Sequence, residues 1–260
     1  MSEAMTIENI LEAYWILEAG GYWTQTRFPF QTEKGGWSDF DSIAYSPQKK
    51  HLVISEAKAQ GKKKTIYVTY FSSEHKFKSL LEKFGKSDSY LSFIQKIRDG
   101  LPNNLKERIR SDAPEKQIQI KKLTIQLVSN WIFYLEDAEQ DVSGIKRGKE
   151  CMKNELKNMI NEFDWIKNPN SNIRVEEVEC LIDTPIEIFA EILKRENCNE
   201  QGRRYGNDIL DLARELNRFS KPTLGRGYGE KIRGKSGLVE QIKNLGGIKY
   251  DLGKKGCKDN

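Results

Sequence analysis

The sequence is poor in histidine, which limits the kinds of active site that it can form. Only two of its 260 residues are histidines, His51 and His75, so a metal site built from several imidazole ligands is excluded. A Ser-His-Asp triad would have to use one of these two side chains. The chain also contains neither the GxxxxGK[ST] pattern of phosphate-binding loops nor the GxSxG pattern of serine hydrolases.

The sequence also shows no CxxC pairs, no pattern typical of a signal peptide and no long apolar runs. The four cysteines are scattered and form no CxxC pair, so neither a zinc knuckle nor a disulfide framework is expected, and free thiols suit a reducing cytoplasm. The first residues, MSEAMTIENILEAYW, carry acids where a signal peptide has basic residues. No uncharged apolar run approaches the roughly 20 residues of a membrane span. We expect a cytoplasmic protein without a membrane partner.

Basic residues are concentrated near the end of the sequence. The chain has 43 Lys and Arg against 38 Asp and Glu, a net charge of +5. Residues 221–260 contribute +6 (ten basic minus four acidic side chains), which leaves −1 for residues 1–220, and the same segment contains nine glycines. Such a basic excess favours a polyanionic partner, although a solubilising tail explains it equally well.

The spacing of apolar residues predicts a mixed α/β protein. Helices are expected at residues 6–19, 74–98 (interrupted near 85–87), 145–162, 185–196 and 206–219. Strands are expected at residues 22–30, 37–46, 51–59, 65–71, 174–182 and 122–128, the last with a continuation through 131–135 left open. Residues 99–117 are polar and are predicted to be a connecting excursion. A central mixed β-sheet flanked by helices would then fill residues 1–183, followed at 184–260 by a helical region with a basic, glycine-rich tail for DNA binding or dimerisation.

Two of the predicted strands form a hairpin around the turn SPQKK. If this turn is centred between Gln48 and Lys49, Asp41 faces Glu56 and Asp39 faces Lys58, and alternation puts all four side chains on one face of the sheet. The opposite face would carry mostly small residues, which suits close packing of a helix: Phe40, Ser42, Ala44, Val53, Ser55 and Ala57.

The opposed carboxylates of Asp41 and Glu56 are the chemical signal of this hairpin. Like charges directly opposite each other, with Cβ atoms about 4.5–5.5 Å apart, destabilise a hairpin unless a cation lies between them. Mg²⁺ prefers such hard oxygen ligands, often one or two carboxylates plus a substrate phosphate, and the Ala57 carbonyl can add another oxygen. Lys58, one step along the same face, can orient or deprotonate a water, or offset charge on a phosphate. The pattern therefore predicts phosphodiester hydrolysis with Mg²⁺, or Mn²⁺ in its place.

A plain surface hairpin explains the same spacing without any chemistry. Asp39 and Lys58 would then form a salt bridge, and a D-x(14)-E-x-K match has little weight because these residues are abundant. The context favours the chemical interpretation. The two strands follow a helix that ends in Gly-Gly-Tyr, and apolar residues flank both acids in SDFDSIAY and LVISEAK.

With these motifs, residues 6–130 resemble the PD-(D/E)XK nuclease superfamily, which includes restriction endonucleases and Mrr-type nucleases. The first acid of that family matches Asp41 and its ExK matches Glu56-Ala57-Lys58, in the family's order of helix, three strands, helix and strand. Many members add an acid on the first helix, for which Glu12 is the best candidate and Glu8 the second. Phe40 stands where the family often has proline, and Asp39 competes with Asp41 as the first acid.

The resemblance implies a restriction-endonuclease-like core and a Mg²⁺-dependent endonuclease that cuts double-stranded DNA, in a prokaryotic restriction or defence role. A homodimer is expected, because cutting both strands symmetrically needs two sites. Two alternatives stay open: a non-catalytic nucleic-acid-binding protein on a nuclease-like fold, and an assembly subunit that docks an acidic partner.

Basic residues outside the hairpin are candidates for contacts with the DNA backbone, although solvated surface lysines and arginines would give the same pattern. Arg-Gly-Tyr segments can follow a nucleic-acid strand by charge and stacking. Gln60 lies two residues beyond Lys58 and can reach the substrate from the same face, or end the strand as a plain polar residue. The basic candidates are Lys62, Lys63, Lys64, Arg203, Arg204, Arg226, Lys231 and Arg233.

Overall fold

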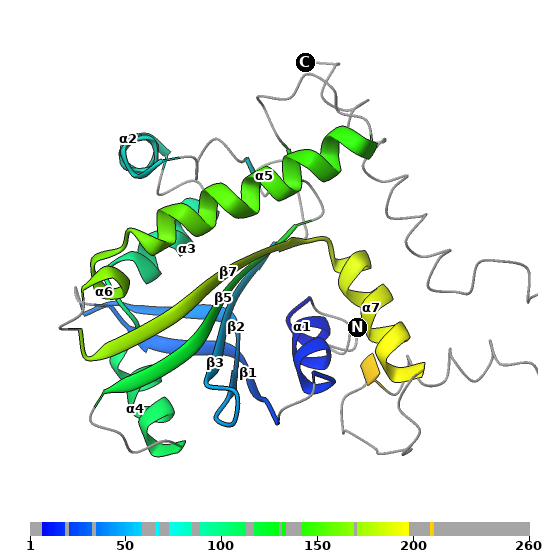
Figure 1. Ribbon diagram of the computed structural model, residues 1–260, viewed down its shortest axis with the longest axis horizontal. Helices are drawn as coiled ribbons and strands as arrows, with labels where there is room; N and C mark the ends of the chain where they lie inside the picture. Colours follow the sequence, from blue (N-terminus) through cyan, green and yellow to red (C-terminus); the bar gives the residue numbers. More distant parts are fainter. Residues whose placement is uncertain are drawn as a thin grey trace, which may run out of the picture.

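A five-stranded mixed β-sheet forms the centre of the protein in the computed structural model (Figure 1). The strand order is β1-β2-β3-β5-β7, with β1 Trp23–Gln31, β2 Trp37–Ser46, β3 His51–Lys58, β5 Ile118–Ser129 and β7 Ile173–Asp183. A second sheet pairs β4 (Ile66–Tyr67) with β6 (Ile132–Phe133). The structure describes residues 7–18, 21–32, 35–58, 66–67, 73–84, 89–112, 117–129, 132–133, 142–168, 171–197 and 209–210.

The direction of the strands changes at β3. The β1–β2 and β2–β3 pairs are antiparallel, whereas β3–β5 and β5–β7 are parallel. Every residue of β3 except Lys58 is buried, as expected for a strand covered on both faces. Because β2 runs against β3, the start of β2 lies beside the end of β3.

Helices cover both faces of the sheet. On one face lie α1 (Ile7–Ile16) and α7 (Pro185–Asn197), and on the other lie α3 (Ser89–Arg98) and α5 (Val142–Asn161) (Figure 1). The larger core forms under α3 and α5, with contributions from α2 (Glu74–Phe84) and α4 (Asn103–Asp112); α6 (Asp164–Lys167) follows α5. The predicted class, α/β with a mixed sheet flanked by helices, is confirmed. None of the helices among the described residues has the length and apolar character needed to cross a membrane.

Three details of the predicted elements are wrong. Residues 99–117 are not a plain excursion, because Leu105 and Ile109 of α4 lie four positions apart and fill the main core. The strand predicted at 122–128 begins at Ile118, and β6 belongs to a separate sheet instead of continuing it. The short helix α6 was not predicted. In the helix expected at 206–219, only residues 209–210 are described, and they are helical. The tail at 221–260 lies outside the described residues.

The predicted hairpin register is confirmed, but the alternation of faces is not. The β2–β3 ladder runs from Ser46↔His51 to Ser42↔Ser55, in the expected register. Phe40, however, packs in the same core as Ile43, not on the opposite face. The β1–β2 ladder steps from Thr26↔Ser42 to Phe28↔Phe40 across Arg27, whose φ of 47° is left-handed. A left-handed residue breaks the two-residue alternation of its own strand, so Phe28 and Phe30 of β1 turn toward the core that also contains Phe40.

Candidate active site

Asp41, Glu56 and Lys58 meet where β2 begins and β3 ends. The Lys58 Nζ atom lies 2.8 Å from Asp41 Oδ2 and 3.0 Å from Glu56 Oε1. All three side chains are largely buried, with Lys58 the most exposed at 23%. The structure thus brings the three predicted catalytic residues together as one cluster, which we call the carboxylate–lysine triad.

Asp41 is held by the backbone as well as by Lys58. Its Oδ2 accepts a hydrogen bond of 2.8 Å from the backbone N–H of Ala57. The last ladder pair is Ser42↔Ser55, so Asp41 lies just beyond the ladder and reaches across to β3 through its side chain. This contact fixes the carboxylate of Asp41 before any ligand arrives. Whether the Ala57 carbonyl acts as a ligand stays a prediction.

The expected pairing of Asp39 with Lys58 is wrong, because Lys58 contacts Asp41 and Glu56 instead. The Asp39 side chain is exposed. Its backbone carbonyl accepts a hydrogen bond of 2.8 Å from Nζ of Lys96 on α3. Of the two candidates for the first acid, Asp41 is therefore the one that belongs to the triad.

Glu56 is the electrostatically unusual member of the triad. Burial, together with the nearby Asp41 charge, raises its pKa to about 7 against the opposing effect of Lys58 and Lys96. Its Oε1 atom meets Lys58, but Oε2 is buried and finds no hydrogen-bond partner within the described residues. A buried acceptor without a hydrogen-bond partner lowers the stability of the fold, which suggests that a bound ligand or ion completes it.

Lys58 is a cation in this setting. Burial alone would lower its pKa, but Glu56 and Asp41 beside it outweigh that effect and raise the pKa above its ordinary value. A lysine held in the charged form is a poor general base and a good partner for a negatively charged phosphate. Of the two roles predicted for Lys58, the geometry favours charge compensation and orientation over proton abstraction.

The donor chemistry of the triad fits a hard divalent cation. No group of three or more His, Cys, Asp or Glu side chains that could enclose a metal occurs in the described part of the chain. Mg²⁺ does not need such a cage, since it commonly binds one or two carboxylates and takes its other oxygens from water and substrate phosphate. Asp41 and Glu56 supply two carboxylates, and the unpartnered Glu56 Oε2 is a free acceptor for the ion.

The two candidate acids of helix α1 contact residues of β1. Glu12 accepts a hydrogen bond of 3.3 Å from Thr24 of β1, and Glu8 lies 3.8 Å from Arg27. The charges that shift the Glu56 pKa come from Asp41, Lys58 and Lys96. The structure ties Glu12 to β1, so its participation in catalysis stays a prediction.

Sequence reasoning missed Lys96. It projects from α3 to the start of β2, and its charge acts on Glu56 although the two residues are 40 positions apart in sequence. Lys96 follows the buried Phe93 and Ile94 on an amphipathic helix. Lysines are common on the polar face of any solvated amphipathic helix, so nothing in the sequence indicated that Lys96 lies near the triad.

His51 has a structural role on the face covered by α1. The Tyr22 hydroxyl donates to its Nδ1, and its Nε2–H donates to Thr124 Oγ1 at 2.8 Å, since the Thr124 hydroxyl in turn donates to Glu179 at 3.0 Å. Burial lowers the pKa of His51 to about 4, so the ring is neutral. His51 therefore stabilises the fold through these hydrogen bonds.

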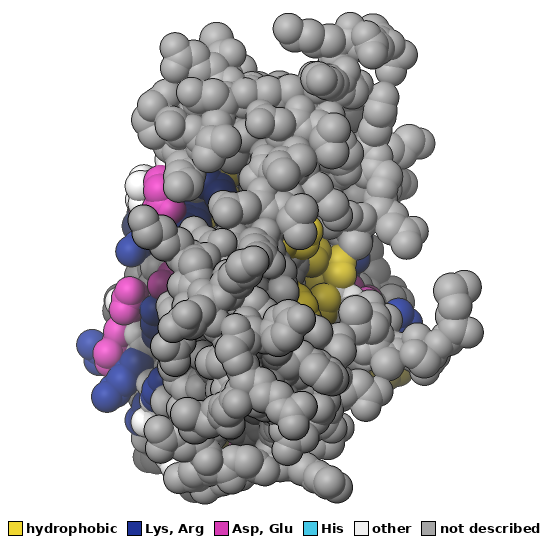
Figure 2. All heavy atoms as spheres, turned by 90° about the vertical axis from the view of Figure 1, so that its right-hand side faces the viewer, with side chains coloured by type: hydrophobic (Ala, Val, Ile, Leu, Met, Phe, Trp, Pro, Cys, Tyr) yellow, Lys and Arg dark blue, Asp and Glu magenta, His cyan; other side chains and the backbone are white. Residues whose placement is uncertain are grey.

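The other predicted substrate contacts lie outside the described residues: Gln60, Lys62, Lys63, Lys64, Arg203, Arg204, Arg226, Lys231 and Arg233. Figure 2 shows the right-hand face of Figure 1, where the described side chains form a mixed border of basic and acidic groups and a hydrophobic group near the centre. Charges of both signs are thus present on the described part of that face.

Comparisons of this chain with known protein families, curated proteins and solved structures found no match.

Proposed function

We propose that this protein is a Mg²⁺-dependent endonuclease that hydrolyses DNA phosphodiester bonds. The observation that carries the proposal is Glu56, whose buried Oε2 has no partner among the described residues while its Oε1 shares Lys58 with Asp41. Two carboxylates and a charged lysine at the edge of a sheet form a site that accepts a cation and a phosphate together.

Each side chain of the triad then has a defined task. Asp41 and Glu56 would hold the ion, and the Ala57 N–H keeps Asp41 in place. Bound Mg²⁺ supplies Lewis-acid polarisation of the phosphoryl group and of water. The Lys58 ammonium would contact the scissile phosphate and offset the charge that develops on its oxygens. Its 23% exposure leaves that ammonium accessible to a ligand.

The arrangement of elements supports a restriction-endonuclease-like core within this proposal. A helix precedes three antiparallel strands, and the third of them continues the sheet in parallel with β5. This order, with Asp41 on the second strand and Glu56-x-Lys58 on the third, is the basis of the resemblance to PD-(D/E)XK nucleases. A restriction or defence role and a homodimer follow from that resemblance alone.

Cleavage of supercoiled plasmid in Mg²⁺ or EDTA tests the proposal. Wild-type protein should cut only with Mg²⁺ or Mn²⁺, while Asp41→Asn, Glu56→Gln and Lys58→Met should each lose about 100-fold or more in rate, because each removes a group that acts in the transition state. Lys121→Ala is the matched control, since Lys121 is exposed at the start of β5, at the far end of the parallel strands. Equal cleavage by the wild type and all three triad variants would refute the assignment.

One observation favours a competing function, a non-catalytic nucleic-acid-binding protein. Lys58 contacts both carboxylates directly, so the triad balances much of its own charge without an ion. Under that function the wild type and Asp41→Asn would bind DNA equally and neither would cut it in Mg²⁺ or Mn²⁺. The same plasmid assay, with DNA binding measured in parallel, separates the two functions.

A further inference from the structure

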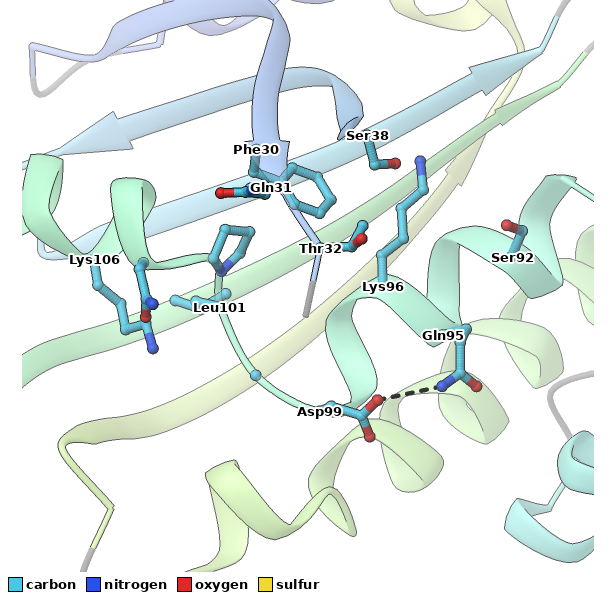
Figure 3. Close-up of a pocket in the computed structure, with 13 residues that line it drawn as sticks. Phe30, Gln31, Thr32, Ser38, Ser92, Gln95, Lys96, Asp99, Leu101 and Lys106 are labelled. Atoms are coloured by element: carbon cyan, nitrogen blue, oxygen red, sulfur yellow. Dashed lines mark hydrogen bonds between the residues drawn. The ribbon is translucent and has the colours of Figure 1, made fainter. Parts of the chain in front are cut away.

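A cavity of about 490 Å³ opens between the β1–β2 turn and the segment that joins α3 to α4 (Figure 3). Two lysines line it, Lys96 from α3 and Lys106 from α4, together with a single acid, Asp99. In Figure 3 the side chain of Lys96 rises from its helix toward Ser38 of β2. The cavity therefore has a basic character and faces the part of β2 that leads to Asp41.

Lys96 connects this cavity to the triad. Its Nζ atom donates to the carbonyl of Asp39, two residues before Asp41, at 2.8 Å. Its charge is also one of those that act on Glu56. A ligand that fills the cavity and contacts Lys96 thus lies beside the site where we propose that the phosphodiester is cut.

The rest of the lining offers hydrogen bonds. One of these groups, the Gln95 side chain, donates to Asp99 at 3.3 Å through Nε2, while its buried Oε1 has no hydrogen-bond partner within the described residues. An amide with one satisfied and one unsatisfied end is suited to a ligand that carries donors, such as the edge of a nucleobase. The polar lining residues are Gln31, Thr32, Ser38, Ser92, Gln95 and Asn103.

Trp37 directly precedes Ser38, one of the residues that line the cavity. It is 77% exposed, the one large hydrophobic side chain with such exposure among the described residues. Its ladder partner is Gln31, which lines the cavity. A single exposed tryptophan is ordinary in isolation, but an indole paired with the lining of a cavity that holds two lysines offers the stacking and the charge that bind single-stranded nucleic acids.

We infer that this cavity binds an unpaired nucleotide of the DNA strand next to the cut, with its base against Trp37 and its phosphates on Lys96 and Lys106. The inference rests on the proposed function, because it assigns the substrate of that site. An unpaired nucleotide is favoured over a duplex because an indole stacks on a base only where that face of the base is uncovered. A space of about 490 Å³ also suits one small polar ligand.

Binding in EDTA, where no cleavage occurs, isolates this contact. The probes are fluorescent oligothymidine of about 16 nucleotides and a blunt duplex of equal length, each titrated over a range of salt. Trp37→Ala should weaken binding of oligothymidine about tenfold and that of the duplex much less, and Trp37→Phe should retain most of the affinity. Lys96→Ala and Lys106→Ala should each reduce the salt dependence of oligothymidine binding by about one phosphate contact, a slope change of about 0.7.

Lys121→Ala is again the matched control, and circular dichroism reports whether each variant is folded. If Trp37→Ala, Lys96→Ala and Lys106→Ala all bind oligothymidine as Lys121→Ala does, the cavity is not a nucleotide site. Wild-type cleavage of plasmid in Mg²⁺ with that result would overturn only this inference. Loss of oligothymidine binding in Trp37→Ala, in a wild-type protein that never cuts DNA, would support the cavity and overturn the proposed endonuclease.

Discussion

At the scale of single residues, the charge of Glu56 serves the proposed chemistry but lowers the stability of the folded protein. Its pKa of about 7 shows that burial and Asp41 work against its charge in the folded protein. A buried charge without full compensation destabilises a protein, and a neutral residue of the same shape often restores stability. Functional sites commonly retain such a cost in exchange for activity.

We therefore predict that Glu56→Gln is more stable than the wild type in EDTA at pH 8, by about 1–2 kcal/mol. The amide keeps the shape of the side chain and removes the repulsion between Glu56 and Asp41, and this gain exceeds the lost contact with Lys58. Chemical denaturation measures the difference. Addition of Mg²⁺ should then raise the midpoint of the wild type but not that of the variant, because ligands stabilise only a state that binds them. A variant less stable than the wild type in EDTA would contradict this account of Glu56.

His51 gives a pH prediction at the same scale. Its pKa is about 4 in the folded protein and about 6.5 in an unfolded chain, so the unfolded chain binds more protons between these values. The stability that comes from the neutral ring is fully present above pH 6.5 and is lost as the pH falls toward 4. The loss amounts to about 3 kcal/mol at most.

Chemical denaturation of the wild type and of His51→Gln from pH 7 to pH 4 checks this prediction. The glutamine does not titrate, so the free energy of unfolding of the wild type should fall more steeply than that of the variant across this window. Carboxylates affect both proteins alike, and the difference between them isolates His51. Parallel pH curves would show that the ring does not titrate as expected.

At the scale of elements, α4 corrects the sequence interpretation of residues 99–117. Leu105 and Ile109 are fully buried in a helix that is otherwise exposed and charged. Truncation of such side chains typically costs 2–5 kcal/mol. We predict a loss of about 3 kcal/mol for Ile109→Ala and almost none for the adjacent, exposed Arg110→Ala, measured by urea denaturation. Similar small effects in both variants would mean that α4 does not belong to the core.

The contrast between α4 and β3 shows which elements the sequence reveals. HLVISEAK is a continuous β-prone run beside a turn, so its strand and its register follow from short-range pattern. In α4 only two apolar residues indicate an amphipathic helix, and the otherwise polar composition resembles that of a loop. The left-handed Arg27 is a further limit, because no local rule places a non-glycine residue there, and it changes which face Phe28 and Phe30 take.

The same limit applies to the site. Asp41, Glu56 and Lys58 were predictable because one hairpin carries all three, and a correct register brings them together. Lys96 and the cavity were not, since they depend on how α3 and α4 pack against the β1–β2 turn. Contacts between distant segments need tertiary structure, and short-range periodicity contains no information about them.

At the scale of the whole molecule, the site lies at one end of the strands in the middle of the sheet. The start of β2, the end of β3 and the Lys96-lined cavity meet there, while His51 and the β2–β3 turn lie at the other end of β3. The described part of one chain contains one such triad, and under the proposed function one triad would cut one strand at a time. Cutting both strands in one encounter requires a second copy of the chain, as the expected homodimer would supply.

We predict that the wild type converts supercoiled plasmid directly to the linear form, and that an excess of Glu56→Gln protein makes nicked circles accumulate. Mixed dimers would carry one working triad and one inactive triad, so each binding event would break only one strand. Agarose gels over a time course distinguish the two products, and Lys121→Ala in the same excess is the control, because it keeps an intact triad. If nicked circles accumulate with the wild type alone, and Glu56→Gln only slows the reaction in proportion to its dilution, the protein acts as a monomer.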